Sequence, residues 1–256
     1  MDYRDKPGND GKNRMRENYT LTRLFVEADL SEGAAVDLAR EQAHYLGNVL
    51  RKSVGDAVRL FNGRDGEWRA EIVALGKKGA GLTCVEQLRP QTQVPDITLL
   101  FAPVRKHRTA FIIEKATELG VRKFQPVLTA RTQFPRLNIE KARLQAIEAA
   151  EQTERLDVPE IAAAKPLKDI LAAWDGTPIL FADEAGDAMR AEDAVENASA
   201  PAAILIGPEG GFTKDERAEL RAMACVSAVT LGPRILRADT AALAMLTLWQ
   251  SGVGDW

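Results

Sequence analysis

One segment decides the fold class of this chain: residues 202–250, AAILIGPEGGFTKDERAELRAMACVSAVTLGPRILRADTAALAMLTLWQ. An apolar run at 203–206 ends in the turn 207-GPEGG-211, and a second apolar run at 226–231 ends in Gly232-Pro233. Between the runs, Thr213 and Glu216 have the spacing of a capping box, which predicts the start of a helix. Short apolar runs bounded by Gly and Pro, with a capped helix between them, predict strand–loop–helix units of an α/β sheet. Because ligands bind outside the carboxyl ends of such strands, the two glycine-containing loops predict a single site built from both.

The glycines indicate a ligand that the backbone approaches closely. Gly207, Gly210 and Gly211 carry no Cβ, so backbone groups there can contact a bound molecule; the alternative is that they only make a tight turn. The phosphate-loop pattern does not fit, because Thr213 stands where its lysine belongs, and the dinucleotide pattern G-x-G-x-x-G does not occur here either. These observations favour a ligand that is uncharged at this point, such as an adenine ring, or a zwitterion.

The same two motifs resemble those of a known family. Residues 206-IGPEGGF-212 and 231-LGPRILR-237, in this order near the end of the chain, resemble the RsmE-type 16S rRNA uridine-N3 methyltransferases of the SPOUT class. The resemblance extends over about residues 20–256 and includes 44-HYLGNVLR-51 followed by Gly55-Asp56. It implies an N-terminal PUA-like β-barrel that binds RNA, a C-terminal SPOUT α/β domain with a trefoil knot, and a homodimer built on the SPOUT domain.

The resemblance also implies the cofactor, S-adenosyl-L-methionine, with S-adenosyl-L-homocysteine as the product. The two glycine-containing strand ends are then the predicted cofactor site. Its predicted residues are Ile206, Gly207, Pro208, Glu209, Gly210, Gly211, Leu231, Gly232 and Leu236.

Composition limits the class of protein. The 256 residues are 45% hydrophobic and 28% charged with a net charge of −3, which argues against a nucleic-acid binder that works by bulk charge but permits a local basic face. Two cysteines and two histidines are too few and too scattered for a zinc site, so no metal is expected. Reduced thiols in apolar runs are consistent with the cytoplasm, and no apolar run is long enough for a membrane helix.

The chain divides into three predicted parts. Residues 1–18 carry both charge signs without an apolar core and are interpreted as a disordered tail rather than a signal peptide. Residues 19–90 form the predicted barrel, with strands at 58–61, 67–72 and 81–85 and a helix at about 41–49. Residues 89–95 form a proline-bracketed linker, and residues 91–256 form the α/β domain.

In the α/β domain, strands are expected at 97–101, 124–128 and 179–181. A helix ends at Leu119 with Gly120 after it, and Asn138 opens a long helix that runs to about Arg155. Strands alternating with helices predict a parallel sheet covered on both faces. The segment 189–201 is interpreted as a surface excursion or a short helix.

Three residues of the second loop are candidates for the chemistry. Methylation of uridine N3 requires loss of the N3 proton, which a carboxylate could accept, and an arginine could stabilise the negative charge on the uracil carbonyls. Arg237 and Arg234 are the predicted arginines, and Asp239 is the candidate base. Family members often carry Glu at this position, and the shorter Asp reaches less far. The alternative for Asp239 is a purely structural helix N-cap before Thr240.

Basic residues define the predicted RNA contacts. Cations at a helix start oppose the helix dipole, which suggests a use for them on RNA phosphates; the alternative is a solvated charged turn. The predicted RNA-binding residues are Arg105, Lys106, Arg108 and Arg131 in the α/β domain, with Arg51 and Lys52 in the barrel. The aliphatic helix 241–249 fits burial in a core or in a dimer interface.

The resemblance therefore implies a methyltransferase acting on 16S rRNA of the small ribosomal subunit. Two alternatives belong to other classes: a ribosome-associated RNA-binding protein of the same fold without catalysis, and an ATP-binding enzyme, which the missing phosphate loop disfavours. The chemistry of the residues leaves uridine N3 and a ribose hydroxyl both open as methyl acceptors.

Overall fold

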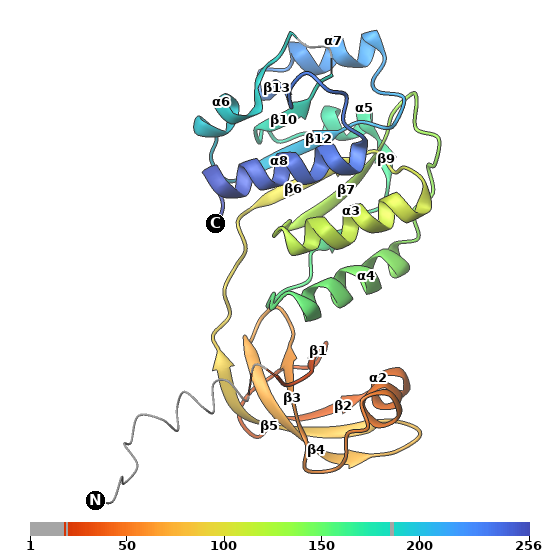
Figure 1. The fold of residues 1–256 in the computed structure, drawn as a ribbon, viewed down its shortest axis with the longest axis vertical. Coiled ribbons are helices and arrows are strands. Elements are labelled where there is room, and N and C mark those ends of the chain that lie inside the picture. The colour runs from red at the N-terminus through yellow and green to blue at the C-terminus, as the bar shows by residue number, and fades with distance from the viewer. Residues whose placement is uncertain (1–17, 19, 185–186) are drawn as a thin grey trace, which may run out of the picture. The chain divides into compact units, whose positions relative to one another are not determined.

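A computed structural model describes residues 18, 20–184 and 187–256. The chain divides into two compact units, with the boundary between Gln93 and Val94 (Figure 1). The predicted linker at 89–95 contains this boundary. The predicted tail at 1–18 lies outside the described residues, apart from Asn18.

The N-terminal unit is built on one five-stranded sheet. Its elements are β1 (Arg23–Phe25), β2 (Ala35–Leu38), α2 (Arg40–His44), the π-helical turn η1 (Tyr45–Val49), β3 (Ala57–Phe61), β4 (Glu67–Leu75) and β5 (Ala80–Arg89). The strand order is β1-β3-β4-β5-β2, with β1 parallel to β3 and the other pairs antiparallel. The three strands predicted here are confirmed, and the predicted helix is α2 continued by η1.

A buried carboxylate joins four strands of this sheet. Glu67 accepts hydrogen bonds from Arg23 Nε at 2.6 Å, from Arg89 Nε at 3.0 Å and from Arg59 Nη1 at 3.4 Å. Burial alone would raise the pKa of Glu67, but hydrogen bonds from Arg89 and Arg23 outweigh burial and hold this pKa below its ordinary value. The Arg23 guanidinium also lies 4.4 Å from the centre of the Phe61 ring. The carboxylate thus ties β1, β3 and β5 to β4.

The C-terminal unit alternates strands and helices. Its first half contains β6 (Ile97–Phe101), α3 (Lys106–Glu118), β7 (Lys123–Leu128), α4 (Ile139–Gln152), β8 (Glu160–Ile161), β9 (Lys165–Pro166) and α5 (Leu167–Ala172). Its second half contains β10 (Ile179–Ala182), β11 (Met189–Arg190), α6 (Ala191–Glu196), β12 (Ala202–Ile206), α7 (Lys214–Ala222), β13 (Val226–Thr230) and α8 (Ala238–Gly252). The strand order is β11-β13-β10-β12-β6-β7-β8, with β9 also paired to β7, and every pair is parallel.

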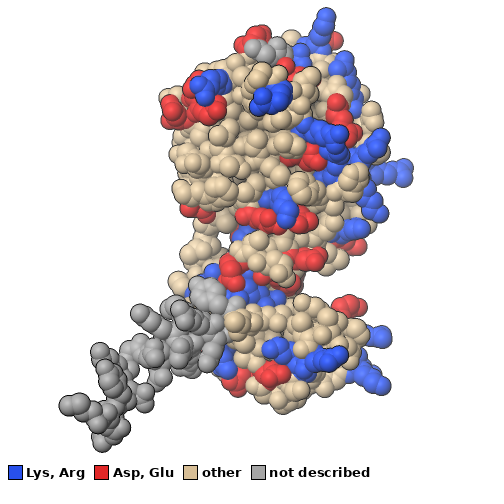
Figure 2. All heavy atoms as spheres, in the orientation of Figure 1, with Lys and Arg blue, Asp and Glu red and all other residues tan. Residues whose placement is uncertain are grey.

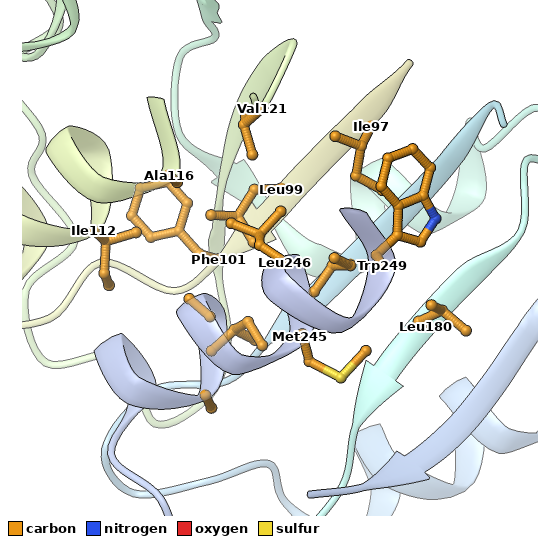
Figure 3. Close-up of a cluster of buried hydrophobic side chains, with 14 of the residues drawn as sticks. Ile97, Leu99, Phe101, Ile112, Ala116, Val121, Leu180, Met245, Leu246 and Trp249 are labelled. Carbon is orange, nitrogen blue, oxygen red and sulfur yellow. The ribbon is translucent and has the colours of Figure 1, made fainter. Parts of the chain in front are cut away.

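Alternate side chains of the central strands point to opposite faces of this sheet. On one face, Leu99 and Phe101 of β6 pack with Ile112 of α3 and with Met245 and Trp249 of α8 (Figure 3). Apolar residues of α4 and α6 complete this layer. On the other face, apolar residues of β6, β10 and β12 pack with α5, α7 and Phe212. The predicted parallel sheet with two covered faces is therefore confirmed. The trefoil knot stays a prediction.

Candidate active site

Three neighbouring strands end at one pocket of about 270 Å³. The strands are β10, β12 and β13, and the pocket is lined by residues 182–184, by 206–209 with 211 and 212, and by 229–238, together with Arg217 and Ala241. The two motif loops predicted to share a site do so. The end of β10 is a third contributor that sequence reasoning missed, although its strand was predicted and is followed directly by Asp183-Glu184.

The first motif loop depends on Gly207 for its shape. A Cβ at Gly207 would lie 2.5 Å from the Phe212 ring, so a side chain there would displace Phe212. The Phe212 ring is buried and packs edge-on against Phe181, with 5.0 Å between ring centres. Gly211 has a φ of +65°, which side chains rarely adopt. The loop therefore closes over the sheet through Phe212 and presents its backbone to the pocket.

Gly210 and Arg131 have other surroundings than predicted. Gly210 is the one predicted cofactor residue that does not line the pocket, and its missing Cβ would face the Arg131 side chain at 3.5 Å. Arg131 Nη1 donates hydrogen bonds to the carbonyl oxygens of Gly210 at 2.8 Å and Phe212 at 3.4 Å. In the structure, Arg131 thus holds the motif loop from outside. Its predicted role in RNA binding stays a prediction.

The second motif loop places two arginines on the pocket wall. Gly232 has a φ of +97° and open space where a Cβ would lie. Arg234 and Arg237 both line the pocket and both are exposed to solvent. Helix α8 begins at Ala238 with Arg237 as its N-cap residue, without a hydrogen bond from the Arg237 side chain. The alternative interpretation of Asp239 as the N-cap is therefore wrong, because the helix starts earlier.

The candidate base Asp239 is engaged elsewhere. Arg108 Nη1 donates to Asp239 Oδ1 at 3.1 Å and to Oδ2 at 2.9 Å, and the Thr240 backbone N–H donates to Oδ1 at 3.0 Å. Asp239 is not among the residues lining the pocket, whereas its helix neighbours Ala238 and Ala241 are. Arg108, predicted to contact RNA, is thus ion-paired with the predicted base.

A charged network fixes α7 against the end of β10. The Asp183 carboxylate is 1% exposed, accepts hydrogen bonds from Arg221 at 3.0 and 2.7 Å, and is ion-paired with Arg217 at 3.0 Å. Arg221 also donates to Asp187, and this hydrogen bond holds the pKa of Asp187 below its ordinary value. Because Asp183 and Arg217 line the pocket, this network sets the position of one pocket wall.

The remaining predicted RNA contacts are surface residues. Arg105 and Lys106 are exposed at the start of α3, and Lys and Arg side chains gather along the edge of the C-terminal unit where α3 begins (Figure 2). In the N-terminal unit, Arg51 is exposed with a φ of +55°, and Lys52 is half-buried. Both residues belong to the N-terminal unit, whereas all residues that line the pocket belong to the C-terminal unit. In the described part of the chain, no group of His, Cys, Asp and Glu could hold a metal ion, and no helix is long and apolar enough to cross a membrane.

Comparison with known proteins identifies both units. A family model described as an RNA methyltransferase domain matches residues 90–250, and one described as an RNA methyltransferase PUA domain matches residues 38–82. Ribosomal RNA small subunit methyltransferase E of Rickettsia conorii is 36% identical over 226 residues, covering 86% of this chain and 91% of that protein. Its counterpart from Synechocystis is 35% identical over 226 residues, covering 86% of this chain and 74% of that protein.

Two solved structures are similar over nearly their whole length. A methyltransferase from Legionella pneumophila in complex with the bound cofactor SAM has a TM-score of 0.83 and 27% identity, covering 92% of this chain and 99% of that one. Ribosomal RNA small subunit methyltransferase E from Neisseria gonorrhoeae bound to S-adenosyl methionine has a TM-score of 0.81 and 29% identity, with the same coverage. The two matching domains, the relatives matched over most of their length and the paired motif loops together show that the chain belongs to the ribosomal RNA small subunit methyltransferase E (RsmE) family.

Proposed function

We propose that this chain transfers a methyl group from S-adenosyl-L-methionine to N3 of a uridine in 16S rRNA of the small ribosomal subunit. The observation that carries the proposal is the pocket at the ends of β10, β12 and β13, where the two motif loops meet beside Arg234 and Arg237. Relatives named as small subunit rRNA methyltransferases, and two similar structures with the cofactor bound, support it.

The residues of the pocket fit this cofactor. Ile206, Leu231 and Leu236 provide apolar wall for an adenine ring, and the loops present backbone rather than side chains at Gly207 and Gly232. Glu184 and Glu209 also line the pocket, and their carboxylates can accept hydrogen bonds from hydroxyl or ammonium groups. Backbone groups and carboxylates around an apolar centre suit a ligand with an adenine ring and a zwitterionic end.

When bound, the cofactor supplies a methyl group on a positively charged sulfur. Uridine N3 must lose its proton, and the freed electron pair of N3 then forms the bond to the methyl carbon while the sulfur keeps the electrons of the broken bond. Arg237 and Arg234 are the pocket's exposed cations on this loop, so they can hold the charge that develops on the uracil carbonyls. Both carboxylate oxygens of Asp239 accept hydrogen bonds from Arg108, outside the pocket. We therefore propose that solvent water, rather than Asp239, accepts the N3 proton.

We further propose a homodimer formed by the C-terminal unit. Most apolar residues of α8 are buried in the unit's own core, but Leu243 and Leu248 stay partly exposed, and Ile235 in the neighbouring loop is 82% exposed. A broad face without charged side chains lies over α8 (Figure 2). Light scattering at micromolar concentration should give twice the mass of the chain, whereas a monomer would contradict this proposal. We also propose that the protein acts in the cytoplasm, where an rRNA substrate would be found.

Mass spectrometry of nucleosides tests the reaction. Small ribosomal subunits lacking the modification are incubated with the protein and with cofactor carrying an isotopically labelled methyl group, and the rRNA is digested to nucleosides. We expect the label in 3-methyluridine. Label in a ribose-methylated nucleoside would contradict the assigned acceptor, and RNA binding without any label would favour the non-catalytic RNA-binding alternative.

A further inference from the structure

Two helix starts that are far apart in the sequence are joined by one ion pair. Arg108 lies in the first turn of α3 and Asp239 in the first turn of α8, 131 residues later, and Arg108 Nη1 contacts both carboxylate oxygens. The two side chains are only 19% and 14% exposed. A pair shielded from water in this way is held more firmly than a solvated surface pair.

The α3 side of this pair belongs to a basic turn. Arg105, Lys106 and His107 are exposed, and they directly precede Arg108. The turn is rigid, because the backbone N–H of Arg108 donates to the Arg105 carbonyl at 2.8 Å and the Thr109 hydroxyl contacts both backbone groups of Val104 at 3.0 Å. These hydrogen bonds fix the backbone position of Arg108 relative to Arg105 and Val104.

The α8 side of the pair belongs to the pocket. Arg237 precedes the helix, lines the pocket and lies two residues before Asp239. The N-cap residue of α8 makes no side-chain hydrogen bond. Within the first turn, the Asp239 carboxylate instead accepts a hydrogen bond from the Thr240 backbone N–H. Ala238 and Ala241 line the pocket, and Asp239 lies on a different side of the helix, where it meets α3.

We propose that Arg108 and Asp239 are positioning residues that hold Arg237 at the pocket in fixed register with the basic turn. The proposal deepens the proposed function and rests on it, since Arg237 is the group assigned to the uracil. Apolar packing already holds α3 against α8, with Ile112 and Ala116 in the same cluster as Met245 and Leu246 (Figure 3). Apolar packing has no preferred direction. The ion pair adds a directional contact between the first turns of the two helices, at the helix ends that face the substrate.

Single-turnover methyl transfer at saturating RNA and cofactor tests the pair. Arg108→Ala and Asp239→Asn should each slow transfer by about tenfold, as expected for loss of a hydrogen bond between charged groups. The double variant should be no slower than either single variant, because both changes remove the same contact. The exchanged pair, Arg108→Asp with Asp239→Arg, should recover part of the rate. Arg105→Ala with Lys106→Ala should instead raise the KM for RNA, because these exposed side chains are the predicted contacts to RNA phosphates.

General-base catalysis by Asp239 predicts a different pattern. Asp239→Asn would then lose about a hundred- to ten-thousand-fold in rate, Arg108→Ala would not match that loss, and the exchanged pair would recover nothing. The rate would also lose its pH dependence in Asp239→Asn, whereas a positioning role leaves the shape of the pH profile unchanged. Either a much larger loss for Asp239→Asn or a flattened profile would overturn the proposal.

Amide hydrogen exchange gives a readout that does not need activity. Arg108→Ala should speed exchange at residues 241–243, in the first turns of α8, by about tenfold. Glu160→Gln is the control. Glu160 forms an ion pair with Lys123 at 3.0 Å, at the start of β7 and therefore at the opposite end of the sheet from the pocket. Unchanged exchange in Arg108→Ala would overturn the proposal. If the wild type transfers no methyl group, the proposed function fails, and exchange alone still decides whether the pair fixes α8.

Discussion

Gly207 and Phe212 are in contact across the first motif loop, so that a Cβ on Gly207 would lie 2.5 Å from Cε2 of the Phe212 ring. Gly207→Ala should therefore push Phe212 out of its packing with Phe181 and reshape the pocket. We expect a loss of about 1–3 kcal/mol in the free energy of unfolding, as for overpacked cores. We also expect at least about a tenfold loss in cofactor affinity, or 1.4 kcal/mol, measured by calorimetry.

Gly210→Ala is the matched control for this change. Its Cβ would lie 3.5 Å from Arg131, an ordinary contact, and the residue does not line the pocket. Stability and cofactor affinity should therefore change little. An equal loss of affinity in both variants would contradict the role given to Gly207.

Arg237 should matter for catalysis more than for cofactor binding. Arg237→Ala removes a guanidinium that lines the pocket, and loss of one preorganised donor typically slows a reaction by about a hundred- to a thousand-fold. Arg237→Lys should recover little, because an ammonium cannot reproduce the planar fork. Single-turnover transfer and calorimetry separate the two effects, with Arg190→Ala, an exposed arginine of β11, as the control. A wild-type rate in Arg237→Ala would rule out this assignment.

Glu67 should make the stability of the N-terminal unit depend on acid pH. Its pKa is lower in the folded chain than the value of about 4.3 for an unfolded Glu. The stabilisation is therefore complete above about pH 4.3 and is lost as the pH falls through the folded pKa. Hydrogen exchange of amides in β3, β4 and β5 between pH 6 and 3 measures this loss.

The Glu67→Gln variant checks the source of that dependence. The pH dependence of its stability should be shallower. At neutral pH the free energy of unfolding should fall by about 3 kcal/mol or more, because the carboxylate is ion-paired with the buried Arg23 and Arg59. Glu71→Gln, on the same strand but with a carboxylate 43% exposed, should keep the wild-type dependence. The same slope in the wild type and in Glu67→Gln would show that another group is responsible.

Asp183 should be the residue that holds α7 in place. Asp183→Asn removes a carboxylate that is 1% exposed and serves both Arg217 and Arg221, so we expect a loss of about 2–4 kcal/mol in the free energy of unfolding. Urea denaturation measures it. Asp187→Asn is the control, because it contacts the same Arg221 but its carboxylate is 67% exposed, and it should change stability little. Equal effects of the two changes would show that burial of Asp183 is not what matters.

Local sequence signals predicted local structure well. The capping box forms as expected, with the Thr213 hydroxyl accepting from the Glu216 N–H at 3.1 Å and the Thr213 N–H donating to Glu216 Oε2 at 2.8 Å. The apolar runs that precede Gly207 and Gly232 both became strands of the parallel sheet. All of these features depend on residues within a few positions of one another, which is why periodicity and turn chemistry could find them.

Contacts between distant residues could not be predicted in this way. Asp239 has the sequence context of an N-cap, but its partner Arg108 is 131 residues away, and the helix begins before Asp239. Arg131 likewise reaches Gly210 from a loop that carries no motif. The strands β8 and β9 have two residues each, too few for any periodicity to show. In each case tertiary packing decides, and a single sequence does not record it.

The pairing of β6 with β12 also governs how the chain folds as it is synthesised. Every strand of the N-terminal sheet has left the ribosome once Arg89 has, so that unit can fold early. Strand β6 is made directly afterwards, yet its partner in register, from Ala202 to Ile206, follows only after more than half of the unit. Until then, Ile97, Leu99 and Phe101 have neighbours from α3 and β7 but lack those that β12 and α8 contribute. We therefore expect the C-terminal unit to fold later and more slowly than the N-terminal unit, because pairings between distant segments form slowly and leave apolar strands uncovered for longer.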